Sequence, residues 1–370
     1  MPRPELGTGD RLVLKVGTTS LVAPDGEPDE PRLRDLCGAI AAARASGIEV
    51  VLVSSCAIAA GLSPLGMSSR PGDIPSLQAA AAVGQGRLLG LYTSMLKAHG
   101  LTVAQLLLTR YDFMHRQQYL NARNTLDRLL ALGVVPIVNE NDTIAVDEIR
   151  FGDNDRLAAL VGNLAHARVL LLLTDARGVH SADPRRTPDA PVIEEIDRIT
   201  PEIERMAGGR GSSLGSGGMA SKLAAAWVAT FSGVGVVVAD AADPDVLKKV
   251  IGGKIVGTYF KPHATRASAR RLWIAFGQPP KGTVIVDAGA RDAVVRDKRS
   301  LLAVGVVGVS GAFDKGDTVD VAEADGGVFA RGLVRYASHE LEAAQGRSTT
   351  ELAAGEVIHR DQLVILEGGR

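Results

Sequence analysis

The chain has 370 residues, of which 46% are hydrophobic and 4% aromatic, and its formal net charge is −1. That length exceeds one ordinary hydrophobic core, so we expect two domains, and the near-zero charge excludes an overall electrostatic attraction to nucleic acid or to an anionic membrane. Cys37 and Cys56 form no CxxC motif or paired framework, and no segment resembles a signal peptide or a membrane span, so we expect a cytoplasmic protein.

Apolar strand-like runs alternate with alanine-rich helical segments as far as about residue 260. Alternation of this kind predicts a mainly parallel sheet with helices on both faces, an αβα sandwich of the α/β class. Ligands of such sheets bind at the carboxyl ends of the strands. The expected strands are 11–17, 48–55, 102–109, 134–139, 168–175 and 234–240, and the two longest expected helices are 32–46 and 76–99.

The first expected strand contains a lysine in an otherwise apolar run. Lys15 is followed at once by Gly17, Thr18 and Thr19, a turn whose exposed amides can bind phosphate oxygens at the strand's carboxyl end. A buried lysine at this position is costly without an anion beside it. The alternative is a lysine that extends to solvent from an edge strand.

The segment from Val134 to Leu160 carries the strongest functional signal. The run VVPIV is typical of a strand buried on both faces, NEND follows at its carboxyl end, and GDND precedes an amphipathic helix. Capping of helix amides explains any one of these polar residues, but two clusters only ten residues apart favour a ligand site, where carboxylates orient ammonium groups or Mg²⁺ and amides donate to an acidic substrate. The candidates are Asn139, Asn141, Asp142, Asp153, Asn154 and Asp155.

A second glycine-rich loop, LGSGGMASK, spans residues 214–222 and leads into a helical segment. Gly215, Gly217 and Gly218 permit close approach of the backbone to a polyphosphate, and Lys222 lies in the first turn of the helix, where it can reach a transferred group. The GxxxxGK[ST] spacing of a Walker A motif is absent. The alternative is a flexible connection without a ligand.

The chain changes character after a basic linker, residues 261–276. From Gly277 to Arg370 short β runs alternate with Gly and Asp turns, which predicts a small β-barrel or sandwich. The expected runs are 282–289, 300–311, 317–324, 329–336 and 361–366. We therefore divide the chain into 1–260, the linker 261–276, and 277–370. The last segment has 11 Lys and Arg against 14 Asp and Glu, a net of about −3, and its aromatic residues are Phe313, Phe329 and Tyr336.

Five motifs follow one another along the chain: KVGTTSL, VSSCAIAAGLSPLG, VNENDTIAVDEIRFGDNDRLAAL, LLLLTDARGVHSADPR and LGSGGMASKLAAA. With these motifs the chain resembles the glutamate-phosphorylating members of the amino acid kinase family across nearly its whole length. The resemblance implies the amino acid kinase fold and ATP-dependent phosphorylation of the γ-carboxylate of L-glutamate to L-glutamate 5-phosphate, the first step toward proline. The C-terminal segment looks like the PUA domain that many bacterial members carry.

The resemblance also implies roles for individual residues. Lys15 and Lys222 match lysines that offset the charge of the transferred phosphoryl group, and Asp155 matches the aspartate that orients them. Mg²⁺ is expected between the β and γ phosphates, held largely by water and phosphate oxygens, so no dense protein metal cage is expected. The substrate residues are Ser55, Cys56, Asn139, Asp142, Asp153 and Asn154. The nucleotide residues are Lys15, Gly17, Thr18, Thr174, Asp175, Ser216, Gly217, Gly218, Met219, Ala220, Ser221 and Lys222.

Regulation and assembly are further implications of the resemblance. The family is inhibited by proline at or near the glutamate site, through a substrate loop that corresponds to Asp112–Asn124 here, a polar segment that we expect to be mobile. Members form dimers and tetramers through the kinase domain. We therefore expect a homo-oligomer, with no membrane partner.

The chain departs from the family motif SGAIAAG at Cys56, where the family has glycine. If the backbone there has positive φ, a Cβ costs about 1 kcal/mol or more and narrows the pocket; if φ is negative, the thiol only crowds it. A reactive thiol is the weaker alternative, because no neighbouring His or Lys would lower its pKa. His180 replaces tyrosine and Ser216 replaces threonine. Every charged member of the site is present, so we expect activity to be retained.

Two other functions stay open on the residues alone. PUA domains elsewhere bind structured RNA, so the chain could be an RNA-binding regulator with an impaired kinase module, although a net-acidic segment with few aromatic residues argues against RNA as a partner. Sister kinases act on N-acetylglutamate, aspartate or a phosphate acceptor. The NEND and GDND clusters together with the PUA-like segment favour free glutamate.

Overall fold

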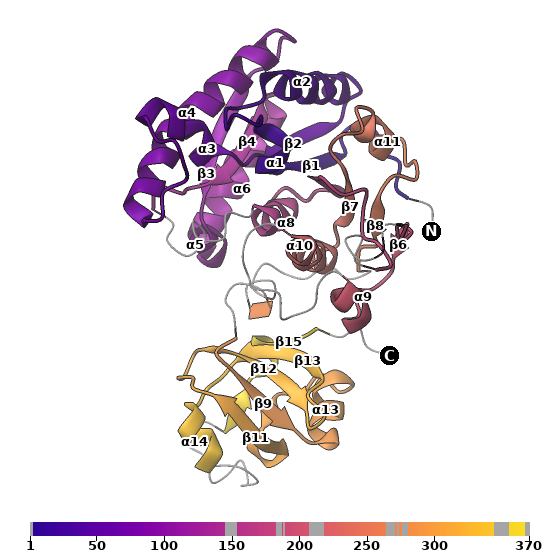
Figure 1. The fold of residues 1–370 in the computed structure, drawn as a ribbon. Helices are drawn as coiled ribbons and strands as arrows, with labels where there is room; N and C mark the ends of the chain where they lie inside the picture. The colour runs from indigo at the N-terminus through magenta and orange to yellow at the C-terminus, as the bar shows by residue number, and fades with distance from the viewer. Residues whose placement is uncertain are drawn as a thin grey trace. The chain divides into compact units, whose positions relative to one another are not determined.

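The computed structural model divides into two compact units, Met1–Arg266 and Ala267–Arg370 (Figure 1). Each unit has its own hydrophobic core. No helix in the described part of the chain is long and apolar enough to cross a membrane. The structure describes residues 3–144, 154–182, 187, 189–206, 218–263, 271, 274–275, 280–343 and 355–366.

The first unit is built on an eight-stranded sheet in the order β3-β4-β2-β1-β5-β7-β8-β6. Strands β1 to β5 and β7 are parallel, whereas β8 runs antiparallel to β7. Both β4 and β5 are buried along their whole length, as expected for parallel strands covered on both faces. The strands are β1 (Arg11–Val16), β2 (Glu49–Val53), β3 (Val103–Leu108), β4 (Val135–Glu140), β5 (Val169–Thr174), β6 (Glu195–Ile196), β7 (Gly235–Asp240) and β8 (Thr258–Phe260).

Helices cover both faces of this sheet, so the predicted αβα sandwich is confirmed (Figure 1). Alternate β1 residues, Leu12, Leu14 and Val16, pack into one core with α2, α4 and α11. Helices α8 and α10 pack against each other and against β1 and β7. The helices are α1 (Thr18–Leu21), α2 (Glu30–Ala45), α3 (Ala57–Leu62), η1 (Ser63–Leu65), α4 (Ile74–Lys97), α5 (Arg110–Met114), α6 (Arg116–Ala131), α8 (Asp155–Leu164), α9 (Pro201–Met206), α10 (Met219–Phe231) and α11 (Val246–Ile251).

The segment Asp112–Asn124 is helical except at His115, so the expectation of a loop was wrong. It belongs to α5 and α6. Thr109 and Asp112 form a capping box that begins α5, in which the Thr109 backbone N–H donates to Asp112 Oδ2 at 2.7 Å. Helix α6 is polar over most of its surface and buries only Leu126 and Leu130, one turn apart, which explains why the hydrophobic pattern was too sparse to predict it.

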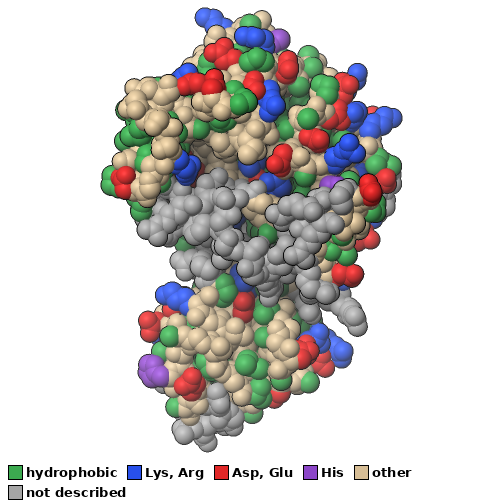
Figure 2. Space-filling view, viewed as in Figure 1, with side chains coloured by type: hydrophobic (Ala, Val, Ile, Leu, Met, Phe, Trp, Pro, Cys, Tyr) green, Lys and Arg blue, Asp and Glu red, His purple; other side chains and the backbone are tan. Residues whose placement is uncertain are grey.

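The second unit consists of a five-stranded sheet in the order β11-β9-β12-β13-β15 and a two-stranded sheet, β10-β14. Strands β9, β10, β11, β12, β13 and β15 lie within the expected β runs to within one residue, whereas β14, α13 and α14 were not predicted. Figure 2 shows acidic and basic side chains interspersed on the visible face of this unit. Its elements are β9 (Gly282–Val286), α13 (Ala288–Val295), β10 (Leu301–Leu302), η2 (Ala303–Gly305), β11 (Val306–Gly311), β12 (Thr318–Glu323), β13 (Val328–Leu333), α14 (Ser338–Ala343), β14 (Glu356–Ile358), η4 (Arg360–Gln362) and β15 (Leu363–Ile365).

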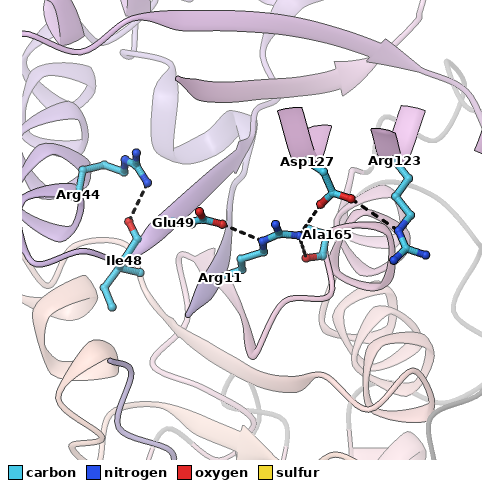
Figure 3. A network of polar contacts seen from close by, with 7 residues as sticks. All are labelled: Arg11, Arg44, Ile48, Glu49, Arg123, Asp127 and Ala165. Carbon is cyan, nitrogen blue, oxygen red and sulfur yellow. Dashed lines mark hydrogen bonds and ion pairs between the residues drawn. The ribbon is translucent and has the colours of Figure 1, made fainter. Parts of the chain in front are cut away.

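A polar network around Arg11, at the start of β1, joins several elements at the amino ends of the strands in the first unit (Figure 3). Arg11 contacts Glu49 of β2 at 2.8 Å and Asp127 of α6 at 2.6 Å, and it donates to the Ala165 carbonyl after α8 at 2.9 Å. Arg123 lies 3.7 Å from the second oxygen of Asp127. This network ties two strands and two helices together at the edge opposite the carboxyl ends, where the candidate site lies.

Candidate active site

Three charged side chains converge at the carboxyl edge of the sheet. The Lys15 amine lies 2.5 Å from Asp155 Oδ1, and the Lys222 amine lies 3.1 Å from Asp155 Oδ2. The exposed fractions of the three side chains are 5%, 0% and 7% in the order Lys15, Asp155, Lys222. The group therefore carries one net positive charge inside the protein, which is suited to an anionic ligand.

Burial alone would raise the pKa of the Asp155 carboxyl, because a low-dielectric environment disfavours the charged form. The ammonium groups of Lys15 and Lys222 outweigh this effect and hold the pKa of Asp155 below its ordinary value. Asp155 therefore stays ionised at neutral pH. One carboxylate, bound through both oxygens, fixes the positions of two amines that are 207 residues apart in sequence.

The fold explains why these three residues meet. Strand β1 lies between β2 and β5, and Lys15 is paired with Val53 on one side and Leu172 on the other. This central position excludes the alternative of an edge-strand lysine. Asp155 lies in the first turn of α8, and Lys222 lies in the first turn of α10, which packs against α8. Both helix N-termini therefore present their side chains beside the end of β1.

A second polar group, made of amides, lies next to the ion-paired residues. Asn154, which directly precedes Asp155, donates to the Ser54 carbonyl and to Asn139 Oδ1, both at 2.6 Å. Asn139 donates to Gln85 Oε1, also at 2.6 Å. All of these side chains are buried. This network connects the ends of β2 and β4 to the start of α8, and it places Ser55 at the same edge.

The other predicted residues lie at the same edge of the sheet or outside the described residues. Gly17 and Thr18 follow β1, and Thr174, at the end of β5, donates to Asp175 Oδ1 at 3.0 Å. Asp142 lies two residues beyond the end of β4 and is half-buried. Gly218 is the N-cap of α10, and Met219, Ala220 and Ser221 are its first three residues. Asp153, Ser216 and Gly217 lie outside the described residues.

Three residues of this region were not predicted: Ser54, Gln85 and Tyr92. The Ser54 hydroxyl shares a hydrogen bond of 2.9 Å with the Tyr92 hydroxyl on α4. Gln85 is the only amide in the run AAAAVGQGRLLG, in a stretch of α4 otherwise made of small and apolar residues and one arginine. A lone buried amide in such a helix requires a partner, and this was the available signal.

Cys56 adopts the left-handed conformation, with φ 84° and ψ 1°, directly before α3. The positive φ is the case in which a Cβ is costly, because L-residues other than Asn and Asp seldom occupy this region. The side chain is buried in the core of the first unit. Burial raises the pKa of the Cys56 thiol to about 12, so the thiol is protonated at neutral pH and is not a reactive nucleophile.

Cys56→Gly is expected to leave kcat/KM equal or higher. Glycine removes about 1 kcal/mol of left-handed backbone strain from the folded protein. In the free energy of unfolding this gain is partly offset by lost burial of the thiol and by greater entropy of the unfolded chain. The charged residues of the site are unchanged, so activity is retained. Steady-state kinetics with both substrates measure the effect. Cys37→Ala is the matched control, because Cys37 is also buried but lies within α2. Loss of activity in the glycine variant would show that the thiol has a role of its own.

The fold and the site indicate the class: an α/β protein without a Walker A motif in which two buried lysines pair with one aspartate at the carboxyl ends of the parallel strands. The model of the amino acid kinase family matches residues 10–240, and that of the PUA domain matches residues 282–355. The chain belongs to the amino acid kinase family. Its relatives include proteins named glutamate 5-kinase, which match this chain over nearly their full length.

The glutamate 5-kinase of Geobacter sp. (strain M21) is 46% identical over 363 residues, covering 96% of this chain and 97% of that protein. The glutamate 5-kinase of Myxococcus xanthus (strain DK1622) is 46% identical over 371 residues, covering 98% of both chains. The glutamate 5-kinase of Burkholderia multivorans is 47% identical over 364 residues, covering 96% of this chain and 98% of that protein. A solved isopentenyl phosphate kinase has a TM-score of 0.47 at 17% identity, covering 68% of this chain and all of that one, a likeness too weak to bear on function.

Proposed function

We propose that the protein phosphorylates the γ-carboxylate of L-glutamate with ATP and forms L-glutamate 5-phosphate and ADP, the first step of proline biosynthesis. The observation that carries this proposal is the buried group of Lys15, Asp155 and Lys222 at the carboxyl edge of the sheet. The names of the full-length relatives support glutamate as the substrate.

The chemistry requires positioning and charge stabilisation rather than a general base. A γ-carboxylate is ionised near neutral pH and is already a competent nucleophile. One of its oxygens forms a bond to the γ-phosphorus of ATP, the bond from that phosphorus to the β–γ bridging oxygen breaks, and ADP leaves with the electron pair. No proton has to be transferred in this step.

Lys15 and Lys222 stabilise the charge on the phosphoryl group as it is transferred. Because both amines are already oriented by Asp155 before the substrates bind, little reorganisation is needed in the transition state. Burial strengthens their interaction with phosphate oxygens, because the local dielectric constant is lower than that of water. The role of Asp155 is to position these amines, not to exchange a proton.

The nucleotide is proposed to bind beside α10 and the end of β5. The N-cap of α10 is Gly218, which has no side chain to cap the helix, so the first backbone N–H groups are suited to phosphate oxygens. Thr174 and Asp175 would contact the nucleoside part. The glutamate is proposed to contact Ser55, Asp142 and Asn154, with Asn139 and Asp153 as supporting residues.

Magnesium is proposed to enter with ATP, and it would neutralise part of the charge on the phosphates. Across the ranges that the structure describes, no group of three or more His, Cys, Asp and Glu side chains could hold a metal ion. Asp155 is bound by two lysines and is not a suitable ligand.

Location, regulation and assembly complete the proposal. Two buried, unpaired cysteines support a reducing compartment, the cytoplasm. Feedback inhibition by proline and assembly into dimers or tetramers are proposed from the family. The boundaries 1–260, 261–276 and 277–370 stay a prediction for the domains.

The two alternative functions are not favoured. Relatives named glutamate 5-kinase match the chain across the PUA domain as well as the kinase domain. The three aromatic residues of the C-terminal segment, Phe313, Phe329 and Tyr336, belong to the hydrophobic core of the second unit. They are therefore not available as stacking platforms for unpaired bases.

The proposed function is tested by incubating the purified protein with ATP, Mg²⁺ and L-glutamate in the presence of hydroxylamine. Hydroxylamine traps the acyl phosphate as a hydroxamate before it cyclises. We expect hydroxamate formation that requires all three components, with one ADP formed for each hydroxamate. Aspartate and N-acetylglutamate are the matched controls. Faster turnover with either of them, or ADP formation without hydroxamate, would contradict glutamate phosphorylation.

A further inference from the structure

Gln85 is a buried amide in the middle of α4, with 8% of its surface exposed. Its side-chain carbonyl accepts a hydrogen bond of 2.6 Å from Asn139 Nδ2. Burying an amide in a helix of small and apolar residues is costly unless the amide is hydrogen-bonded. Gln85 is therefore part of the hydrogen-bonded network of amides beside the site.

Two backbone groups fix the orientation of these amides. The Glu140 backbone N–H can only donate, and it donates to Asn139 Oδ1 at 2.9 Å. The Nδ2 group of Asn139 must then face Gln85, which must present its carbonyl oxygen. The Ser54 carbonyl can only accept, so the group of Asn154 that faces it is Nδ2. The positions of the oxygen and nitrogen atoms in these amides therefore follow from their hydrogen-bond partners.

The orientation decides which group Asn154 offers to a ligand. Its amide nitrogen donates to the Ser54 carbonyl and to Asn139 Oδ1. Both of its N–H groups are used inside the protein, so its carbonyl oxygen is the group available to a ligand. An oxygen acceptor one residue from Asp155 is suited to an ammonium group, such as that of an amino acid substrate.

We propose that Gln85 is a positioning residue for the amino acid substrate: its side-chain carbonyl fixes the amides of Asn139 and Asn154 so that Asn154 presents an acceptor. This inference rests on the proposed function and extends it to a residue on α4. Without an acceptor at position 85, Asn139 Nδ2 is left buried and unsatisfied, and rotation of Asn139 changes the orientation of Asn154. The Ser54 carbonyl, at the start of the Ser55–Cys56 turn, then loses its donor.

The test compares Gln85→Met with Gln85→Glu in the hydroxamate assay. Methionine has a similar volume but no comparable acceptor, so we expect the glutamate KM to rise about tenfold, the size of one lost buried hydrogen bond. The kcat and the ATP KM are expected to stay within about twofold, because the ion-paired residues are unchanged. Glutamate at position 85 keeps an oxygen acceptor and is expected to hold the glutamate KM within about threefold of the wild type.

Leu96→Ala is the matched control for stability, because Leu96 is fully buried at the carboxyl end of the same helix. It should lower the melting temperature without raising the glutamate KM. A glutamate KM unchanged in Gln85→Met, or raised equally in Gln85→Met and Leu96→Ala, would overturn the inference. If Gln85→Met does not fold, a tenfold rise in folded Gln85→Glu would overturn it as well. A wild-type protein without glutamate-dependent activity would instead overturn the proposed function, and with it the inference.

Discussion

Lys222→Met is expected to lower kcat for glutamate phosphorylation about a thousandfold, with a small effect on folding. Removing one preorganised cationic or hydrogen-bonding group from a charged transition state commonly costs two to five orders of magnitude. The fold should persist, because Asp155 stays paired with Lys15 at 2.5 Å and no unpaired buried charge is created. The glutamate KM should change little.

The measurement is single-turnover and steady-state hydroxamate formation, with circular dichroism to verify folding. The matched control is Lys249→Met, since Lys249 is also ion-paired, to Asp243 at 2.6 Å, but lies on α11 with 42% of its side chain exposed. We expect wild-type kcat for the control. A Lys222→Met enzyme with the kcat of the wild type would exclude Lys222 from phosphoryl transfer.

Gly84→Ala is expected to reduce the free energy of unfolding by about 3 kcal/mol and to raise the glutamate KM. A Cβ at this position would lie 1.8 Å from the Ala57 carbonyl oxygen and 2.5 Å from the Gly61 nitrogen. Both atoms are backbone atoms, so no side-chain rotation relieves the overlap and α3 must move away from α4. Since Cys56 directly precedes α3, the turn at Ser55 and Cys56 moves with it.

Gly86→Ala and Gly90→Ala are the matched controls in the same helix, because a Cβ at either position would have no atom within 4 Å. Alanine has the higher helix propensity, so each control should be more stable by up to about 1 kcal/mol. Denaturant titration of the three variants measures the difference. A Gly84→Ala protein as stable as the controls would show that α3 and α4 are not in backbone contact.

Local patterns were sufficient to predict the sheet and the residues at its carboxyl edge. The β-branched run before Asn139 and the apolar run around Lys15 each identify a buried strand, and parallel strands end at one edge. Short or atypical elements were not predictable in this way. Strand β6 has two residues and β8 has three, too few for a periodic pattern.

Long-range contacts account for the rest of what was missed. The sequence names Lys15, Asp155 and Lys222 as candidates, but only the packing of α8 against α10 determines that one carboxylate binds both amines. Gln85 is 54 residues from its partner Asn139, and no local rule joins them. The positive φ of Cys56 was also not predictable, because L-residues favour negative φ, whereas the glycine of the family motif is compatible with either sign.

The most direct test of the arrangement is a crystal structure of the protein with ADP, aluminium fluoride, Mg²⁺ and L-glutamate. Aluminium fluoride occupies the position of the phosphoryl group in transfer. We expect the amines of Lys15 and Lys222 both within about 3.2 Å of its fluorine atoms, with Asp155 between them and a γ-carboxylate oxygen on the opposite side of the aluminium from ADP. Either amine turned away from the fluoride toward another part of the protein would contradict the proposed mechanism.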